Sequence, residues 1–200
     1  MKDDLIATQT PKCRITDPEK ALAALERAVP GLADLRRPEP AAIDWAVLEG
    51  SLGTALPCDY QYLAEWYPPF AVGGFLLIAL PEPGKEHDTL RGIRDSLDVL
   101  ADAWLEPHIG LRSHPAPGGL LPRAESDESD KFLWSTTEDT PQDWIVTIAS
   151  RSGGWWHYSG GALQFLAEYC DGTLEPWALP PVAPEATPCG AGGRERRSGH

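Results

Sequence analysis

The sequence predicts one α+β domain in which a mostly antiparallel sheet packs against helices. Helix-like patterns come first along the chain, at residues 19–29, 45–53 and 58–67. Three strand-like segments follow later in direct succession, at residues 131–136, 143–150 and 154–159. Short polar or glycine-containing turns separate these three segments, as in a meander of consecutive antiparallel strands. Such a sheet commonly packs one face on helices and leaves the other face wet.

The first three helices are predicted from their boundary residues and from apolar spacing. Asp17 and Pro18 suit the N-cap and first turn of a helix that stops at Pro30. A second helix is expected to end at Gly53, and a third to begin at Pro57 and end before Pro68. Five apolar residues in and between the second and third helices are expected to lie in the interface between these helices and the sheet: Trp45, Leu48, Leu56, Tyr60 and Leu63.

The later elements are predicted from the same signals. A short apolar run at residues 75–80 lies between glycines and prolines, which favours a buried strand. The longest helix is expected to begin at Asp88, because apolar residues then recur along one side as far as Leu105. Residues 114–130 are expected to be mostly loop. Ser159 is the expected cap of a last helix at residues 162–170.

These elements divide the chain into three parts. Residues 1–42 are expected to form a helical N-terminal extension and linker, and residues 43–172 the domain itself. Residues 173–200 are rich in proline and glycine and end in the basic segment GGRERRSGH. Such a composition buries little apolar surface, so this tail is predicted to be disordered.

The negative charge is concentrated in the predicted domain. Residues 43–172 contain 20 acidic and 7 basic residues, whereas the two flanking parts are each balanced. This balance disfavours nucleic acid and anionic membranes as partners and favours a basic protein. Acidity that serves only solubility is the alternative.

Several classes of protein are disfavoured by absent signals. No run of about 18 apolar residues is present, so no membrane span is expected. The N-terminus lacks the basic and apolar regions of a signal peptide, which predicts a cytoplasmic protein. The four cysteines are far apart and form no CxxC pair, so neither a zinc site nor a disulfide framework is expected.

An enzyme is also disfavoured, and no cofactor or metal is expected. The chain has no GxSxG motif, no phosphate-binding loop and no dinucleotide fingerprint. His108 and His114 lie in a loop rich in proline and glycine, and nearby acids could join them around a metal. A solvated acidic loop is the favoured interpretation of those acids, which are Glu125, Asp127, Glu128 and Asp130.

The segment GGWWHYSGG places aromatic residues on both faces of one predicted strand. Side chains alternate across a sheet, so Trp156 and Tyr158 share one face, and Trp155 and His157 share the other. One of these pairs is expected to be in the core, against Phe165 of the last helix. The other pair is expected either to form an open surface for a protein partner or to be covered by the N-terminal arm or the tail.

Four stretches together carry a resemblance to a known family. They are IDWAVLEGSLGTALPCDYQYLAEWYPP, GGFLLIALP, GGLLPRAESDESDKFLWSTTEDTPQDWIVTIASR and GGWWHYSGGALQFLAEYCDG. Their order and spacing resemble the SUKH superfamily, which includes the yeast Smi/Knr cell-wall regulator and many bacterial immunity proteins. The chain departs from the family at SDESDK, where many members have an Asn-Gly turn.

The resemblance implies a SUKH-like fold and a binding function without catalysis. Bacterial members commonly neutralise a cognate toxin, often a nuclease, in polymorphic toxin systems. A regulatory or scaffolding module without a toxin partner, as in the eukaryotic relatives, is the alternative. The residues that we expect to contact a partner are Glu125, Asp127, Glu128, Asp130, Trp155, Trp156, His157 and Tyr158.

Overall fold

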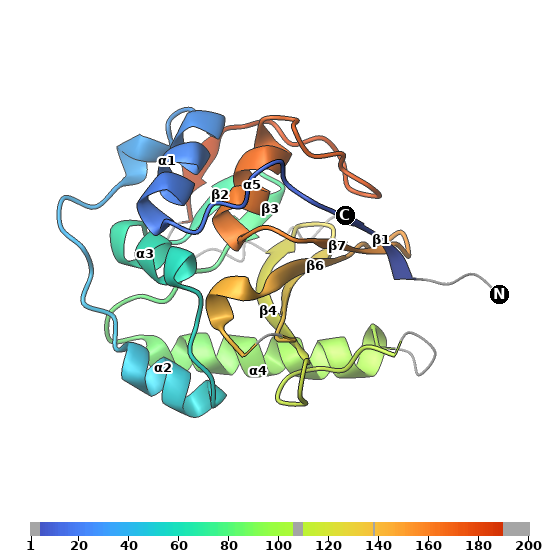
Figure 1. Ribbon diagram of the computed structural model, residues 1–200. Coiled ribbons are helices and arrows are strands. Elements are labelled where there is room, and N and C mark those ends of the chain that lie inside the picture. Colours follow the sequence, from blue (N-terminus) through green and yellow to red (C-terminus); the bar gives the residue numbers. More distant parts are fainter. Residues whose placement is uncertain (1–4, 106–109, 138, 190–200) are drawn as a thin grey trace, which may run out of the picture.

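The computed structural model describes residues 5–105, 110–137 and 139–189 (Figure 1). Its helices are α1 (Pro18–Ala28), α2 (Trp45–Leu52), α3 (Cys58–Trp66), α4 (Glu86–Ala103) and α5 (Ala162–Cys170). Its strands are β1 (Leu5–Gln9), β2 (Phe70–Val72), β3 (Leu76–Ile78), β4 (Leu120–Ser126), β5 (Lys131–Ser135), β6 (Ile145–Ala149), β7 (Trp155–Tyr158) and β8 (Ala186–Pro188). Two short 3-10 turns, at Leu32–Leu35 and Pro141–Asp143, complete the order. The predicted α+β class is confirmed.

The described strands form one sheet in the order β1-β7-β6-β5-β4-β3-β2-β8. Every neighbouring pair is antiparallel except β1 and β7, which run parallel. The expected meander is present as β5, β6 and β7. It is preceded by β4, which the prediction of a loop at residues 114–130 missed.

Helices cover both faces of the sheet (Figure 1). On one face, Phe132, Trp156 and Tyr158 pack against Phe165 of α5, with ring centroids 5.6–6.0 Å apart. On the other face, Leu133 and Trp155 belong to a smaller cluster with residues of α4, including Leu100. The sheet is therefore an inner layer, with α1, α3 and α5 on one side and α4 on the other.

The helix boundaries show which capping predictions hold. Asp17 caps α1 as expected, and its carboxylate accepts from the backbone N–H groups of Glu19 and Lys20. The longest helix begins at Glu86, slightly before the predicted Asp88. Ser159 is not the cap of α5. The N–H of Leu163 donates instead to the Asp59 carboxylate, 3.2 Å away on α3.

The N-terminal arm is part of the same folded body and not a separate extension. Strand β1 pairs with β7, and α1 packs against α5 and α3. The guanidinium of Arg14 donates to the carbonyls of Ser159 at 2.7 Å and Trp144 at 3.2 Å. The arm is thus joined to the meander by backbone pairing and by side-chain hydrogen bonds.

The tail also differs from the prediction, because residues 173–189 are ordered against the domain. Strand β8 pairs with β2, and Leu174 and Leu179 are buried. Gly73, in the turn between β2 and β3, has a φ of +62° and lies so near the tail that a Cβ would be 2.6 Å from the carbonyl of Ala183. The predicted disorder of residues 190–200 lies outside the described residues.

Candidate protein-binding site

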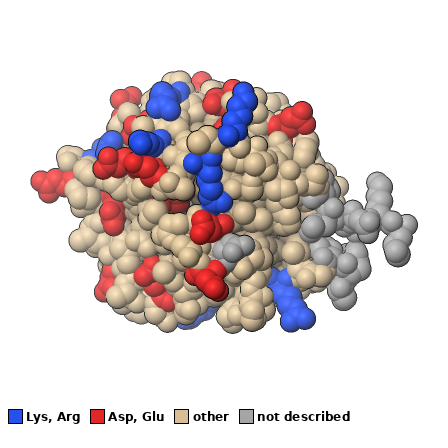
Figure 2. Space-filling model, viewed as in Figure 1, with Lys and Arg blue, Asp and Glu red and all other residues tan. Residues whose placement is uncertain are grey.

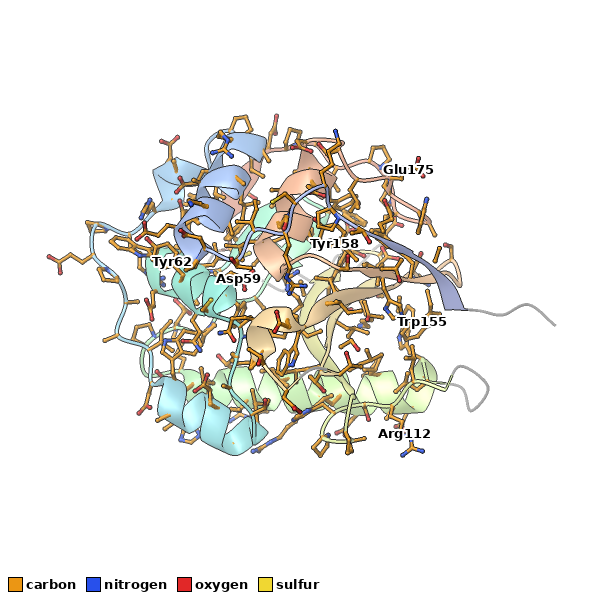
Figure 3. All side chains as sticks on the ribbon, in the orientation of Figure 1. Asp59, Tyr62, Arg112, Trp155, Tyr158 and Glu175 are labelled. Carbon is orange, nitrogen blue, oxygen red and sulfur yellow. The ribbon has the colours of Figure 1, made fainter. Side chains whose placement is uncertain are left out.

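Strand β7 does not present an open aromatic face, so this part of the predicted site is wrong. Trp155 is 4% exposed, and Trp156 and Tyr158 are each 0% exposed. Tyr158 lies beside α5, and Trp155 lies on the α4 side of the sheet (Figure 3). The predicted alternation of the side chains between the two faces is correct. The ring that packs on Trp155 is that of Trp104, which directly follows α4.

The tail completes the burial on the opposite face of β7. Trp177 packs edge-on against Trp156, with centroids 5.6 Å apart. The pair that packs on Phe165 is Trp156 with Tyr158, and the tail adds Trp177 to that face. On the other face Trp155 is covered by α4 and Trp104, and not by the N-terminal arm or the tail that were expected to cover it. The three large aromatic residues of β7 are core residues and do not form a contact surface.

His157 is held within the sheet. Its Nδ1 lies 2.9 Å from the Thr147 hydroxyl on β6. Burial lowers the pKa of His157 below its usual value, so the ring is neutral near pH 7. The ring therefore adds no positive charge to this region.

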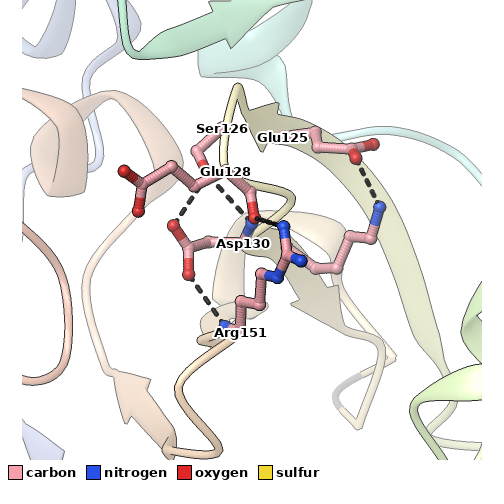
Figure 4. Close-up of polar contacts among 6 residues, drawn as sticks. Glu125, Ser126, Glu128, Asp130 and Arg151 are labelled. Atoms are coloured by element: carbon pink, nitrogen blue, oxygen red, sulfur yellow. Dashed lines mark hydrogen bonds and ion pairs between the residues drawn. The ribbon is translucent and has the colours of Figure 1, made fainter.

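The acidic residues lie in and beside a tight turn between β4 and β5, here called the acidic turn (residues 126–130). The Ser126 hydroxyl donates to the Asp130 carboxylate at 2.7 Å, and the Asp130 N–H donates to the Ser126 hydroxyl at 2.9 Å (Figure 4). Ser129 has a φ of 75°, in the left-handed region that few residues other than glycine adopt. These hydrogen bonds give the turn one defined shape.

Neighbouring turns hold the acidic turn in place. The backbone N–H of Asp127 donates to the Phe75 carbonyl between β2 and β3, at 2.8 Å. The backbone N–H of Arg151, between β6 and β7, donates to the Asp130 carboxylate at 2.9 Å (Figure 4). The Arg151 guanidinium also reaches the Glu128 carbonyl at 3.4 Å. Three connections between strands therefore meet at one end of the sheet.

The four predicted acids have different roles in this arrangement. Asp130 is 3% exposed and is a structural group, so its prediction as a partner contact is wrong. The Glu125 carboxylate forms an ion pair with the Lys131 ammonium, 2.7 Å away. Asp127 and Glu128 are exposed at the tip of the turn. Only these last two carboxylates project freely as an acidic pair.

We expect Asp130→Ala to destabilise the protein by about 2–3 kcal/mol, because it removes the acceptor of the buried Ser126 hydroxyl and of the partly buried Arg151 N–H. The measurement is urea unfolding followed by tryptophan fluorescence. Asp127→Ala, on the same turn, is the control and should change the free energy of unfolding by less than about 0.5 kcal/mol. Equal effects of the two substitutions would contradict the structural role of Asp130.

Sequence reasoning named the acids but missed the groups that organise them, Ser126 and Arg151. No local pattern marks either residue, since each acts across the turn or from another hairpin. Outside the turn, charges are mixed: Figure 2 shows acidic and basic side chains interspersed over the face in view. A second group of exposed acids lies along α4, at Asp88, Asp95, Asp98 and Asp102.

Within the described ranges, no three residues among histidine, cysteine, aspartate and glutamate are grouped to hold a metal ion. His114 is engaged by the Leu52 carbonyl, 2.8 Å from its Nε2, and His108 lies outside the described residues. In the same part of the chain, every helix is too short or too polar to cross a bilayer.

The fold and the turn define an α+β protein with an ordered acidic projection at one end of a mixed, mostly antiparallel sheet. Comparison with models of known protein families, with curated proteins and with solved structures finds no match to this chain.

Proposed function

We propose that this chain is a non-enzymatic, cytoplasmic protein-binding domain that neutralises a basic toxin domain, such as a nuclease, by direct contact. The motif order that resembles the SUKH superfamily supports the immunity role. The observation that carries the binding role is the acidic turn, in which Asp127 and Glu128 are exposed while the buried Asp130 carboxylate fixes the backbone beneath them.

Pre-organisation makes such a turn suitable for recognition. A partner that binds an already ordered loop loses less conformational entropy than one that must order it. Two neighbouring carboxylates attract a basic surface during diffusion and set its orientation. The turn is thus suited to raise the association rate and to orient the partner as it binds.

A partly exposed apolar side chain lies beside the acidic turn. It takes the anchoring role that was expected of the tryptophans. Leu77 is 45% exposed on β3, and it is the register partner of Glu125 on β4. Protein-binding surfaces commonly combine an apolar centre with a polar rim. We assign Leu77 as the apolar anchor of the proposed interface.

The double variant Asp127→Lys/Glu128→Lys should bind the toxin encoded by a neighbouring gene with an association rate about tenfold lower at low salt. The dissociation rate should change less, because exposed charges act mainly before contact. Surface plasmon resonance at low and high sodium chloride measures both rates.

A matched control is available on α4. Asp98→Lys/Asp102→Lys makes the same change in net charge, at exposed positions near the C-terminal end of the helix, where lysine is favourable. This control should slow association far less than the variant of the turn. Equal slowing by both variants would mean that total charge, and not the acidic turn, governs association.

A further inference from the structure

A cavity of about 340 Å³ lies where β3 and β4 separate. The two strands are paired only at Leu76 with Ser126 and at Leu77 with Glu125. Beyond that point β4 contains Pro122, which has no N–H to donate, and its register with β5 shifts between Pro122 and Ala124. The strands diverge there and leave a space between them.

The walls of this cavity are mainly apolar. One side is the surface of α4, at Gly92, Ile93 and Ser96. The opposite side includes Tyr60 and Trp134, whose rings meet edge-on with centroids 4.9 Å apart. The volume lies within the range of small-molecule sites, which is about 300–1,000 Å³. The cavity can therefore hold a small apolar body.

Arg123 lines the same cavity and is an unusual residue to bury. It is 5% exposed, and none of its three guanidinium nitrogens has a hydrogen-bond partner in the protein. The guanidinium carbon lies 5.9 Å from the ring centroid of Trp134. Burial lowers the pKa of Arg123 to about 10, although Asp59 and Tyr60 oppose this shift, and the group remains charged at pH 7.

The other charged groups that line the cavity are already paired. Asp88 forms an ion pair with Arg91, with an N–O distance of 3.2 Å, and Glu125 forms one with Lys131 at 2.7 Å. The carboxylate of Asp59, which attracts Arg123 electrostatically, accepts hydrogen bonds from the backbone N–H groups of Tyr60 and Leu163. The wall of the cavity therefore includes one cation whose hydrogen-bonding capacity is unmet.

We propose that this cavity binds a small apolar monocarboxylate, whose carboxylate pairs with the Arg123 guanidinium while its apolar body lies between α4 and Trp134. A single carboxylate matches the single unmatched charge, and guanidinium binds it through paired hydrogen bonds. A dianion such as phosphate would leave one charge uncompensated among apolar walls. Because the three nitrogens are enclosed, pairing requires Arg123 to rotate toward the cavity.

Octanoate and its neutral analogue octanamide are the probes, titrated into the full-length protein by calorimetry. We expect octanoate to bind the wild type at least about tenfold more tightly than octanamide, because only octanoate pairs with Arg123. Arg123→Met keeps a similar apolar volume. This substitution should weaken the binding of octanoate about tenfold or more and leave the affinity for octanamide unchanged.

Thermal unfolding supplies a second readout. Removing an unpaired buried charge should raise the melting temperature of Arg123→Met without ligand by a few degrees, and added octanoate should raise that of the wild type only. Gly92→Leu occupies the cavity from α4, where a Cβ meets no atom within 4 Å, and should abolish binding of both probes. It serves as the test variant if Arg123→Met does not fold.

Three results would overturn the proposal. The first is no saturable binding of octanoate to the wild type up to about 10 mM ligand, which corresponds to a binding free energy weaker than about −3 kcal/mol. The second is equal octanoate affinity in the wild type and Arg123→Met. The third is unchanged binding in Gly92→Leu, which would place the ligand elsewhere.

Discussion

Ending the chain after Gly172 is expected to destabilise the fold by about 5 kcal/mol or more. The shortened protein loses Leu174 and Leu179, each buried, and truncation of one buried leucine typically costs about 2–5 kcal/mol. It also loses Trp177, which covers Trp156, and the Pro180 carbonyl, which accepts from the Tyr169 hydroxyl at 2.6 Å. A loss of this size is comparable with the whole stability of many domains.

The matched control for this truncation ends after Cys189 and retains every described residue of the tail. Its free energy of unfolding should equal that of the full chain within about 0.5 kcal/mol. Urea unfolding and near-ultraviolet circular dichroism distinguish the two shortened proteins. Native stability in the protein that ends after Gly172 would show that the contacts of residues 173–189 contribute nothing to the fold.

Replacing Trp156 by alanine is expected to cost about 3–5 kcal/mol, as for other fully buried aromatic residues. Its side chain is 0% exposed between Phe165 and Trp177, with ring centroids at 6.0 and 5.6 Å. The indole N–H makes no hydrogen bond in the protein, so Trp156→Phe should cost less than Trp156→Ala. Equilibrium denaturation measures both changes.

Leu77→Ala is the control for Trp156→Ala, because Leu77 is 45% exposed and should change stability by roughly 0.5 kcal/mol or less. Binding data add a second contrast. Leu77→Ala should speed dissociation of the partner, whereas Trp156 affects binding only through folding. A folded Trp156→Ala protein of native stability would mean that β7 does face outward.

Much of the fold could be predicted because its longest elements carry clear local signals. Asp17 and Pro18 mark the start of α1, and β5, β6 and β7 were expected from three apolar segments joined by short turns. Strands β1, β2, β4 and β8 were missed. The first and last gain their hydrogen bonds from distant partners, and β4 contains Pro122 and a polar second half that is typical of loops.

The candidate site could be predicted only in part, for a related reason. Period-2 alternation assigned Trp155 and Trp156 to opposite faces correctly. Which face is covered depends on Trp104 and Trp177, whose positions follow from the tertiary fold. Asp127 and Asp130 look alike in the sequence, and the contacts with Ser126 and Arg151 distinguish the buried structural acid from the exposed one. Arg123 gave no signal, because the groups around it, Trp134, Asp59 and Tyr60, belong to other elements of the fold.

The most direct test of the account is capture of the partner from the native host, with the neighbouring genes co-expressed, followed by salt-dependent association kinetics. We predict a dominant, stable, basic protein whose association rate falls as salt rises and falls further with Asp127→Lys/Glu128→Lys. An acidic dominant partner, no partner at all, or a partner that binds this variant as fast as the wild type would contradict the proposed function.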